Sequence, residues 1–366
     1  MIKVLVVGQT PPPVHGQAVM IQKLLEGQFK YIKLYHVNMA FSADIDEVGR
    51  FSFGKIFHLL SVIIRIIWMR FRHGIDVLYY PPAGPNKVPM YRDFAILILT
   101  RWLFSRTVFH FHAGGLSELV ATLSLPERWL ARLAYYHADC AIRLATLNPE
   151  DGKQLQAKQD IVIPYGLEDN YITGHHKQNQ IPKILFVAVL SPSKGVNILL
   201  DACKLLKDDG FQFTLELMGR FHSVEFEKSV KKKVVSFGLS SYVTFLGVKT
   251  GNDKWQAFSK TDIFCFPSFY EAETFGLVVL EAMQFELPVV TTCWRGIPSL
   301  VHDGETGYLV AIKDAEAVAA KLRLLLENEN KRKMMGKRGR EIYLQEFTLE
   351  EWYKRMEQAF LDVTKK

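Results

Sequence analysis

The 366-residue chain has only four cysteines, and no two of them form a C-x-x-C pair. This scarcity excludes a disulfide framework and a zinc site of clustered thiolates, and it favours a reducing compartment. Cys265 and Cys293 both lie in apolar, strand-like runs. We therefore expect both side chains to be buried packing residues.

Long hydrophobic runs are also lacking. The most apolar segment, 56–68, is interrupted by His58 and Arg65 and is shorter than the roughly 20 apolar residues that a membrane-spanning helix needs. The apolar run at 2–7 is too short for a signal peptide, so the sequence predicts a cytoplasmic protein whose first element is a buried strand. With 49% apolar and 23% charged residues, the chain is expected to fold along its length.

Acidic residues are scarce between residues 50 and 106, where nine lysines and arginines face only Asp76 and Asp93. Several of these arginines adjoin the apolar run, so a helix over 56–72 could lie on an anionic membrane surface. The alternative is a packed helix whose arginines are solvated. No helix-turn-helix, zinc or aromatic–basic motif is present, which argues against nucleic acid as a partner.

Short runs rich in Val, Ile and Phe alternate with helix-like segments along the whole chain. This pattern predicts an α/β fold with parallel sheets, and the length predicts two domains. The predicted strands are 3–7, 77–80, 108–112, 140–146 and 161–164 in the first half, and 183–190, 213–218, 243–246, 262–267, 288–292 and 307–310 in the second.

A polar stretch without apolar periodicity separates the two halves. We predict domains at 1–172 and 183–345, a linker at 173–182 and a final segment at 346–366. Helices are expected over 314–327 and near the C-terminus, where Trp352, Met356 and Phe360 form a core-facing stripe. Ligands of open parallel sheets bind beyond the carboxyl ends of the strands, so the loops there are the places to look for chemistry.

The most informative segment is 267–283, in which a strand ends in a polar loop and a helix follows. A helix start presents free backbone N–H groups to phosphate, and Gly276 lets an anion approach closely. Glu281 lies about 7.5 Å further along the helix, a reach suited to sugar hydroxyls beside a bound diphosphate. Alternatively, Glu273 merely favours the helix dipole and Glu281 lies on a solvated face.

Glu273 and Glu281, with seven residues between them, resemble the E-x7-E signature of the family-four retaining glycosyltransferases of the GT-B fold, also called glycosyl transferases group 1. Further segments resemble that family at the expected places along the chain. They are 161–166, 186–195, 296–301 and 303–310.

The resemblance implies that Lys194 neutralises the donor diphosphate, that Glu281 binds the ribose hydroxyls and that Glu273 binds the donor sugar near the bond that breaks. The other donor-binding residues that it implies here are Thr274, Phe275, Gly276, Leu277 and Val278. Without the resemblance, Lys194 could be a surface lysine at a helix start.

In the first half, the loop 9–17 resembles the family's glycine-rich loop, although the usual Gly-Gly is His15-Gly16 here. Gly16 is therefore implied to lie beneath the donor. Strand alternation directs His110 and His112 to one face, and the resemblance implies that His112 is the catalytic histidine near the reacting sugar. A lone strand histidine is otherwise usually structural.

The chain departs from the family pattern at two places. Ala188-Val189 stands where a Gly-Arg pair is expected, and we hypothesise that Arg220 supplies the missing charge from the neighbouring loop. Tyr165 replaces the usual asparagine before Gly166, which leaves the contact at that hinge open.

The resemblance implies a GT-B fold, with two Rossmann-like domains facing a central cleft and a C-terminal helix that returns to the first domain. It implies a retaining hexosyltransferase that moves a sugar from a UDP- or GDP-sugar to a glycan or lipid-linked acceptor in bacterial surface polysaccharide biosynthesis. Neither a metal nor a cofactor is expected, since the nucleotide sugar is a substrate. The alternatives are a nucleotide-sugar epimerase or hydrolase and a catalytically silent partner subunit. A nicotinamide-dependent dehydrogenase is disfavoured, because no G-x-G-x-x-G follows the first strand.

Overall fold

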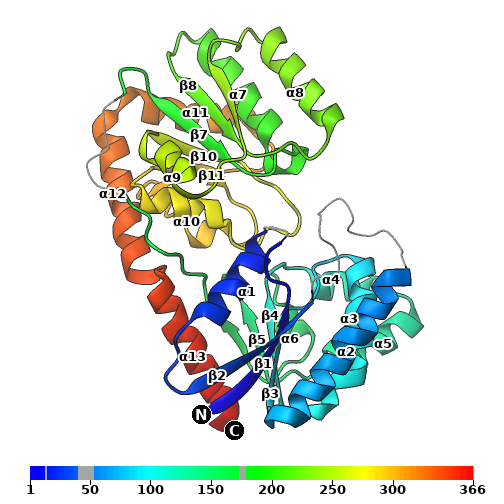
Figure 1. Cartoon of the computed structure of the whole chain (residues 1–366). Coiled ribbons are helices and arrows are strands. Elements are labelled where there is room, and N and C mark those ends of the chain that lie inside the picture. The colour runs from blue at the N-terminus through cyan, green and yellow to red at the C-terminus, as the bar shows by residue number, and fades with distance from the viewer. Residues whose placement is uncertain (13–14, 40–52, 173–178, 366) are drawn as a thin grey trace. The chain divides into compact units, whose positions relative to one another are not determined.

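The computed structural model describes residues 1–12, 15–39, 53–172 and 179–365. The chain folds into two compact units, of which unit 1 comprises Met1–Tyr165 with Glu350–Lys366 and unit 2 comprises Gly166–Leu349. Each unit holds a six-stranded sheet flanked by helices (Figure 1). All strand pairs are parallel, as the alternation of strands and helices predicts.

The unit 1 sheet has the strand order β2-β1-β3-β4-β5-β6. Its strands are β1 Ile2–Gly8, β2 Ile32–Asn38, β3 Val77–Tyr80, β4 Arg106–Phe111, β5 Cys140–Arg143 and β6 Asp160–Val162, and its helices are α1 Gly16–Glu26, α2 Phe53–His73, α3 Lys87–Thr100, α4 Leu116–Ala121, α5 Leu125–Tyr135, α6 Asp151–Gln154 and α13 Leu349–Lys365. The sequence does not predict β2, because this edge strand is partly exposed and is not a continuous apolar run.

The core of unit 1 lies between the sheet and the layer formed by α2, α3 and α5. Alternate strand residues such as Leu5, Leu78 and Phe109 point into it and meet buried side chains of the three helices. The opposite sheet face carries α13, where the ring of Phe360 lies 5.9 Å from that of Tyr79. The C-terminal helix thus returns to the first domain, as predicted.

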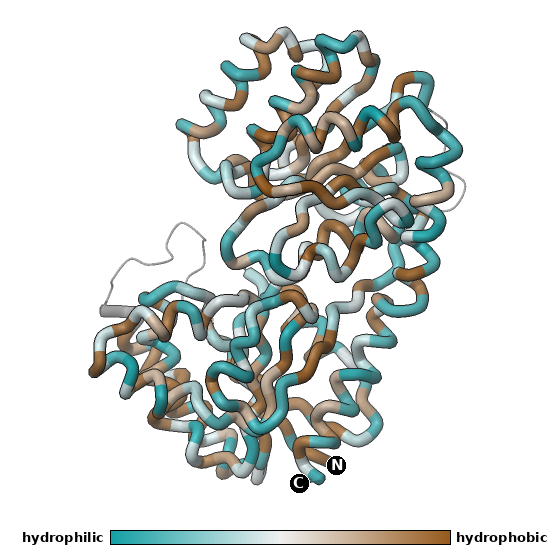
Figure 2. Tube along the Cα trace, turned by 180° about the vertical axis from the view of Figure 1, so that it is seen from behind, coloured by the Kyte–Doolittle hydropathy of each residue, from teal (hydrophilic) through white to brown (hydrophobic). Residues whose placement is uncertain are grey.

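The unit 2 sheet has the order β12-β11-β10-β7-β8-β9. Its strands are β7 Lys183–Val187, β8 Thr214–Met218, β9 Val243–Gly247, β10 Ile263–Phe266, β11 Val289–Thr292 and β12 Gly307–Val310, and its longer helices are α7 Val196–Asp208, α8 Val224–Ser236, α9 Gly251–Ser259, α10 Leu277–Gln284, α11 Ala315–Glu327 and α12 Glu329–Glu346. Strands β10 and β11 are buried along their whole length, and Figure 2 shows hydrophobic segments within each unit. Short runs rich in apolar residues are therefore enough to predict such strands.

One prediction about the cysteines is wrong. Cys140, Cys203 and Cys265 are buried, but Cys293 is exposed. Strand β11 ends at Thr292. Cys293 is the next residue, so it lies outside the sheet and is not covered by it.

The predicted linker 173–182 lies partly outside the described residues, and so do residues 13–14 of the loop 9–17. Within the described ranges, no helix combines the length and the apolarity that crossing a membrane requires.

Candidate functional site

The candidate site of unit 2 is built from loops that follow neighbouring strands at the carboxyl edge of the sheet. The backbone N–H of Phe269, after β10, donates to the carbonyl of Ser193, after β7, at 2.8 Å. The indole of Trp294, after β11, donates to the carbonyl of Tyr270 at 2.8 Å. These bonds hold the three loops together where ligands of parallel sheets bind.

Gly195 allows the β7 and β10 loops to approach so closely. Its φ of +86° is in the left-handed region, and a Cβ there would lie 2.1 Å from the carbonyl oxygen of Pro267. Any side chain would therefore push the two loops apart. The position of the adjacent Lys194, which ends the short 3-10 helix Pro192–Lys194, depends on this glycine.

Lys194 and Glu273 meet at the centre of this loop cluster. Their Nζ and Oε2 atoms are 2.6 Å apart, and the Ser268 hydroxyl donates to the same carboxylate oxygen at 3.3 Å. The Lys194 ammonium also lies 4.4 Å from the centre of the Tyr270 ring. Both charged side chains are largely buried, so this lysine is a concentrated positive charge held by a carboxylate and an aromatic face.

Helix α10 begins beside this pair. Gly276 is its N-cap in the left-handed conformation, with φ +76°. The N–H of Val279 already donates to Gly276, whereas the preceding amides of Leu277 and Val278 start the helix and have no acceptor within it. Thr274 and Phe275, just before the cap, are buried. Together these features give the loop-to-helix geometry that suits a phosphate.

Glu281, one turn further along α10, is buried rather than solvated, with a side chain only 11% exposed. Its Oε1 accepts from the ammonium of Lys254 at 2.5 Å, and its buried Oε2 has no hydrogen-bond partner within the described residues. Sequence reasoning missed Lys254, because the lysine comes from α9 and no spacing motif links it to α10. The solvated-face alternative for Glu281 is therefore wrong.

Arg220 follows β8, the strand next to β7. Its carbonyl accepts from the N–H of Leu190 at 2.8 Å, so the two loops adjoin. The Arg220 side chain is exposed. Its place beside the lysine loop is compatible with the hypothesis that it supplies the charge missing at Val189.

The unit 1 candidate His112 lies in a buried cluster of rings with His110, Tyr79 and Tyr165. The hydroxyl of Tyr79 contacts Nδ1 of His110 at 2.7 Å and Nε2 of His112 at 3.2 Å, and the hydroxyl of Tyr165 contacts Nδ1 of His112. Burial lowers the pKa of His110 to about 3 and that of His112 well below its usual value. Both histidines are thus neutral at physiological pH.

His110 and His112 share a face as strand alternation predicts, with ring centres 4.2 Å apart. Gly16 is exposed and starts α1, whose N-cap is the side chain of His15. Sequence reasoning did not foresee that tyrosine hydroxyls would contact both ring nitrogens of His112, since Tyr79 comes from another strand. In the described ranges, no group of three or more His, Cys, Asp or Glu is placed to hold a metal ion.

Solved structures share this architecture over nearly the whole chain. Sucrose-phosphate synthase from Thermosynechococcus elongatus matches with a TM-score of 0.77 at 18% identity, covering 100% of this chain and 99% of that chain. HepE from Anabaena, solved in complex with UDP-glucose, matches with a TM-score of 0.68 at 19% identity, covering 99% and 100%. The protein has the GT-B fold; at such low identities the likeness shows the fold alone.

Residues 168–342 match the family model described as glycosyl transferases group 1, and this region belongs to that family. The amylovoran biosynthesis glycosyltransferase AmsK of Erwinia amylovora is 32% identical over 151 residues, which are 40% of this chain and 36% of AmsK. The capsular polysaccharide biosynthesis glycosyltransferase CapM of Staphylococcus aureus is 27% identical over 194 residues, 53% of this chain and 47% of CapM. The chain thus spans about a third to a half of the length of these curated relatives.

Proposed function

We propose that the protein is a retaining glycosyltransferase that transfers a sugar from a nucleotide diphosphate sugar to a glycan or lipid-linked acceptor. The relatives named for capsule and amylovoran biosynthesis support a role in bacterial surface polysaccharide assembly. HepE, solved with UDP-glucose, supports a UDP-sugar as the first donor to test, with a GDP-sugar as the second. We place the reaction in the cytoplasm, at the inner face of the plasma membrane when the acceptor is lipid-linked.

The observation that carries this proposal is the Lys194–Glu273 pair beside the start of α10, within the region that belongs to the family. Lys194 and the first amides of α10 would stabilise the negative charge that develops on the leaving diphosphate. Glu273 would contact the donor sugar once Lys194 exchanges its ion pair with Glu273 for one with the diphosphate. Because these groups are protein-borne, the proposed mechanism uses no metal or cofactor.

Glu281 would hold the ribose hydroxyls, since a buried carboxylate oxygen without a partner accepts hydrogen bonds readily. Arg220 would add a second positive charge, and Gly16 is a proposed donor-binding residue of unit 1. His112 would act as a neutral group near the reacting sugar. The proposed mechanism assigns no carboxylate as a covalent nucleophile, and the leaving phosphate itself would assist the acceptor.

The experiment is release of nucleoside diphosphate from UDP-, GDP-, ADP- and TDP-sugars with mixed lipid and sugar acceptors. Wild type is compared with Glu281→Ala and with Glu227→Ala, which alters an exposed ion pair on α8. We expect acceptor-dependent release from one donor that only Glu281→Ala abolishes. Release without acceptor would favour an epimerase or hydrolase, and donor binding without turnover would favour a silent partner subunit.

A further inference from the structure

Helix α2 carries an apolar stripe on its outer side. Phe57, Leu60, Ile64, Trp68 and Phe71 are all exposed, and Phe57 is 73% exposed. At 100° per residue these positions fall within one narrow sector. Another sector of the helix, with buried residues at 62, 63 and 66, packs into the core of unit 1. The helix therefore has two apolar faces, and only one of them is used for folding.

The two neighbouring helices of the same layer repeat this arrangement. On α3 and the turn after it, Val88, Tyr91, Leu99 and Trp102 are exposed and share one face, and Trp102 is 75% exposed. On α5 the exposed apolar residues are Leu125, Trp129 and Leu133, with Leu125 80% exposed. The exposed apolar residues of α2, α3 and α5 with the turn after α3 form what we call the three-helix surface.

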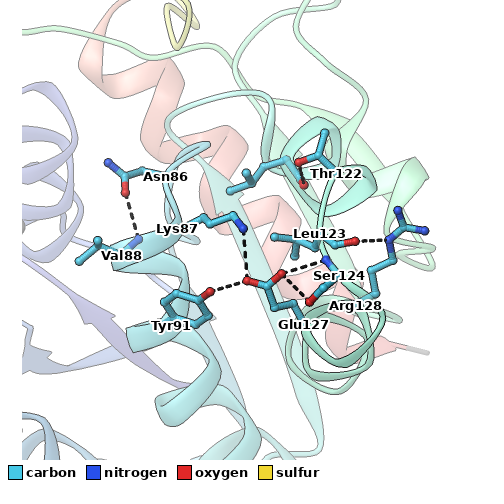
Figure 3. Close-up of polar contacts among 10 residues, drawn as sticks. Asn86, Lys87, Val88, Tyr91, Thr122, Leu123, Ser124, Glu127 and Arg128 are labelled. Carbon is cyan, nitrogen blue, oxygen red and sulfur yellow. Dashed lines mark hydrogen bonds and ion pairs between the residues drawn. The ribbon is translucent and has the colours of Figure 1, made fainter.

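Direct contacts join the outer sides of α3 and α5. Lys87 Nζ lies 3.3 Å from Glu127 Oε1, and the hydroxyl of Tyr91 donates to the same oxygen (Figure 3). Further along, Trp102 and Leu133 line one shallow pocket of about 400 Å³. Helix α2 packs against α3 in the same layer (Figure 1). The three stripes thus lie on adjacent helices of one layer, and contacts between outer side chains join those of α3 and α5.

The charges around this surface are mostly positive. Arg65 and Arg72 flank the stripe of α2, Arg128 and Arg132 flank that of α5, and all four side chains are exposed. The acidic residue at its centre, Glu127, is already paired with Lys87. An apolar surface rich in tryptophan and bordered by arginine matches a membrane interface with anionic headgroups.

We propose that the three-helix surface binds the surface of an anionic lipid bilayer, with its apolar side chains at the headgroup level and its arginines on lipid phosphates. Aliphatic residues such as Leu60, Ile64 and Leu125 favour this partner over nucleic acid, which pairs basic residues with stacking aromatics. The proposal goes beyond sugar transfer, because binding to lipid needs neither donor nor acceptor. It also extends the membrane interpretation of residues 56–72 to three helices.

The test is co-sedimentation of the full chain with vesicles of phosphatidylcholine alone or with 30% phosphatidylglycerol, without nucleotide. We expect at least tenfold stronger binding to the anionic vesicles, weakened by salt. Arg128→Glu/Arg132→Glu should reduce this binding about tenfold or more. The matched control is Lys228→Glu/Lys232→Glu, an exposed basic pair of the same spacing on α8 of unit 2.

Tryptophan fluorescence locates the contact. In each variant one tryptophan is kept and all the others are changed to phenylalanine. Brominated lipids should quench the fluorescence of Trp68, Trp102 and Trp129 but not that of Trp294. Equal binding to both vesicle types, or equal loss in the two charge-reversal variants, would overturn the proposal. A concentration-dependent dimer that Trp102→Ser/Trp129→Ser dissociates, with no vesicle binding, would assign the surface to a second copy of the chain instead.

Discussion

The ammonium of Lys194 and the carboxylate of Glu273 lie 2.6 Å apart, although 79 positions separate them in the sequence. The lysine proposed to hold the donor diphosphate is thus engaged by a carboxylate that would also face the donor. On this proposal, a diphosphate and Glu273 would compete for one positive charge, and their competition would set how tightly the donor binds.

Lys194→Met should weaken binding of UDP or GDP about 10- to 100-fold, since one charge-assisted hydrogen bond of about 1.5–3 kcal/mol is lost. Glu273→Gln should instead strengthen binding of the free nucleotide several-fold while it abolishes transfer. Isothermal titration measures both affinities. Lys204→Met, which breaks an exposed pair with Asp208 on α7, is the control. Weaker nucleotide binding by Glu273→Gln would contradict the competition.

Arg220→Ala tests the hypothesis about the charge missing at Val189. The exposed guanidinium lies on a loop whose backbone bonds to Leu190. We expect donor affinity to fall about 5- to 10-fold, a loss smaller than that for Lys194, because an exposed charge is screened by solvent. The measurement is again titration with UDP and GDP, and Val189→Arg/Arg220→Ala should restore the affinity. Unchanged affinity in Arg220→Ala removes this residue from the site.

Lys254→Met should destabilise the folded chain by about 1–3 kcal/mol, because the largely buried carboxylate of Glu281 loses its cation. Lys231→Met breaks an exposed pair with Glu227 and should cost less than about 1 kcal/mol. Adding Glu281→Gln to Lys254→Met should recover part of the stability. Denaturant unfolding of wild type, Lys254→Met, Glu281→Gln and the double variant measures the coupling between the two residues. Additive losses would show that the pair contributes nothing.

Gly195→Ala should be among the most destabilising single substitutions in unit 2. Its Cβ would meet the Pro267 carbonyl in a backbone conformation that already disfavours alanine. Gly210, with a similar φ of +82° and nothing within 4 Å, is the matched control. Gly210→Ala should lower the free energy of unfolding by about 1–2 kcal/mol, and Gly195→Ala should lower it clearly more. The midpoint of urea unfolding measures both changes. Equal midpoints would mean that the β10 loop yields to the added methyl group.

The sequence predicts most of this fold because the central strands are buried on both faces. The runs at 77–80 and 307–310 coincide with β3 and β12, while the strand expected at 183–190 ends three residues earlier, at Val187. Strand β2 escapes prediction because Lys33 is exposed and the residues between Ile32 and Val37 are only partly buried. Helix α12 escapes too, since it is strongly polar and its few buried residues include two glycines.

The candidate site is predictable only where its residues are close in sequence. The spacing of Glu273 and Glu281 and the glycine at 276 can be read from one segment. The partners Lys254 and Tyr79 come from other elements, so only the folded chain shows that they contact Glu281 and His112. The direct pairing of Lys194 with Glu273 likewise follows from the adjacency of β7 and β10 in the sheet.

The buried histidines make the stability of unit 1 depend on pH. Burial holds the pKa of His110 at about 3 and that of His112 well below its usual range, whereas both titrate near 6.5 in the unfolded chain. Below pH 6.5 the unfolded chain binds protons that the folded chain does not, so stability falls as pH falls. When the pH falls from 7.5 to 5.5, each histidine should lower the free energy of unfolding by about 1.4 kcal/mol.

Over this pH range, the free energy of unfolding of His110→Phe should therefore fall by about 1.4 kcal/mol less than that of wild type. In this variant the Tyr79 hydroxyl keeps His112 as a partner. Tyr79→Phe removes a hydroxyl but leaves both histidines buried, so its stability should be lower at every pH while the slope stays that of wild type. Urea unfolding at pH 7.5, 6.5 and 5.5 gives the three slopes. If His110→Phe kept the wild-type slope, His110 would already be protonated in the folded chain, and its burial would not exclude charge.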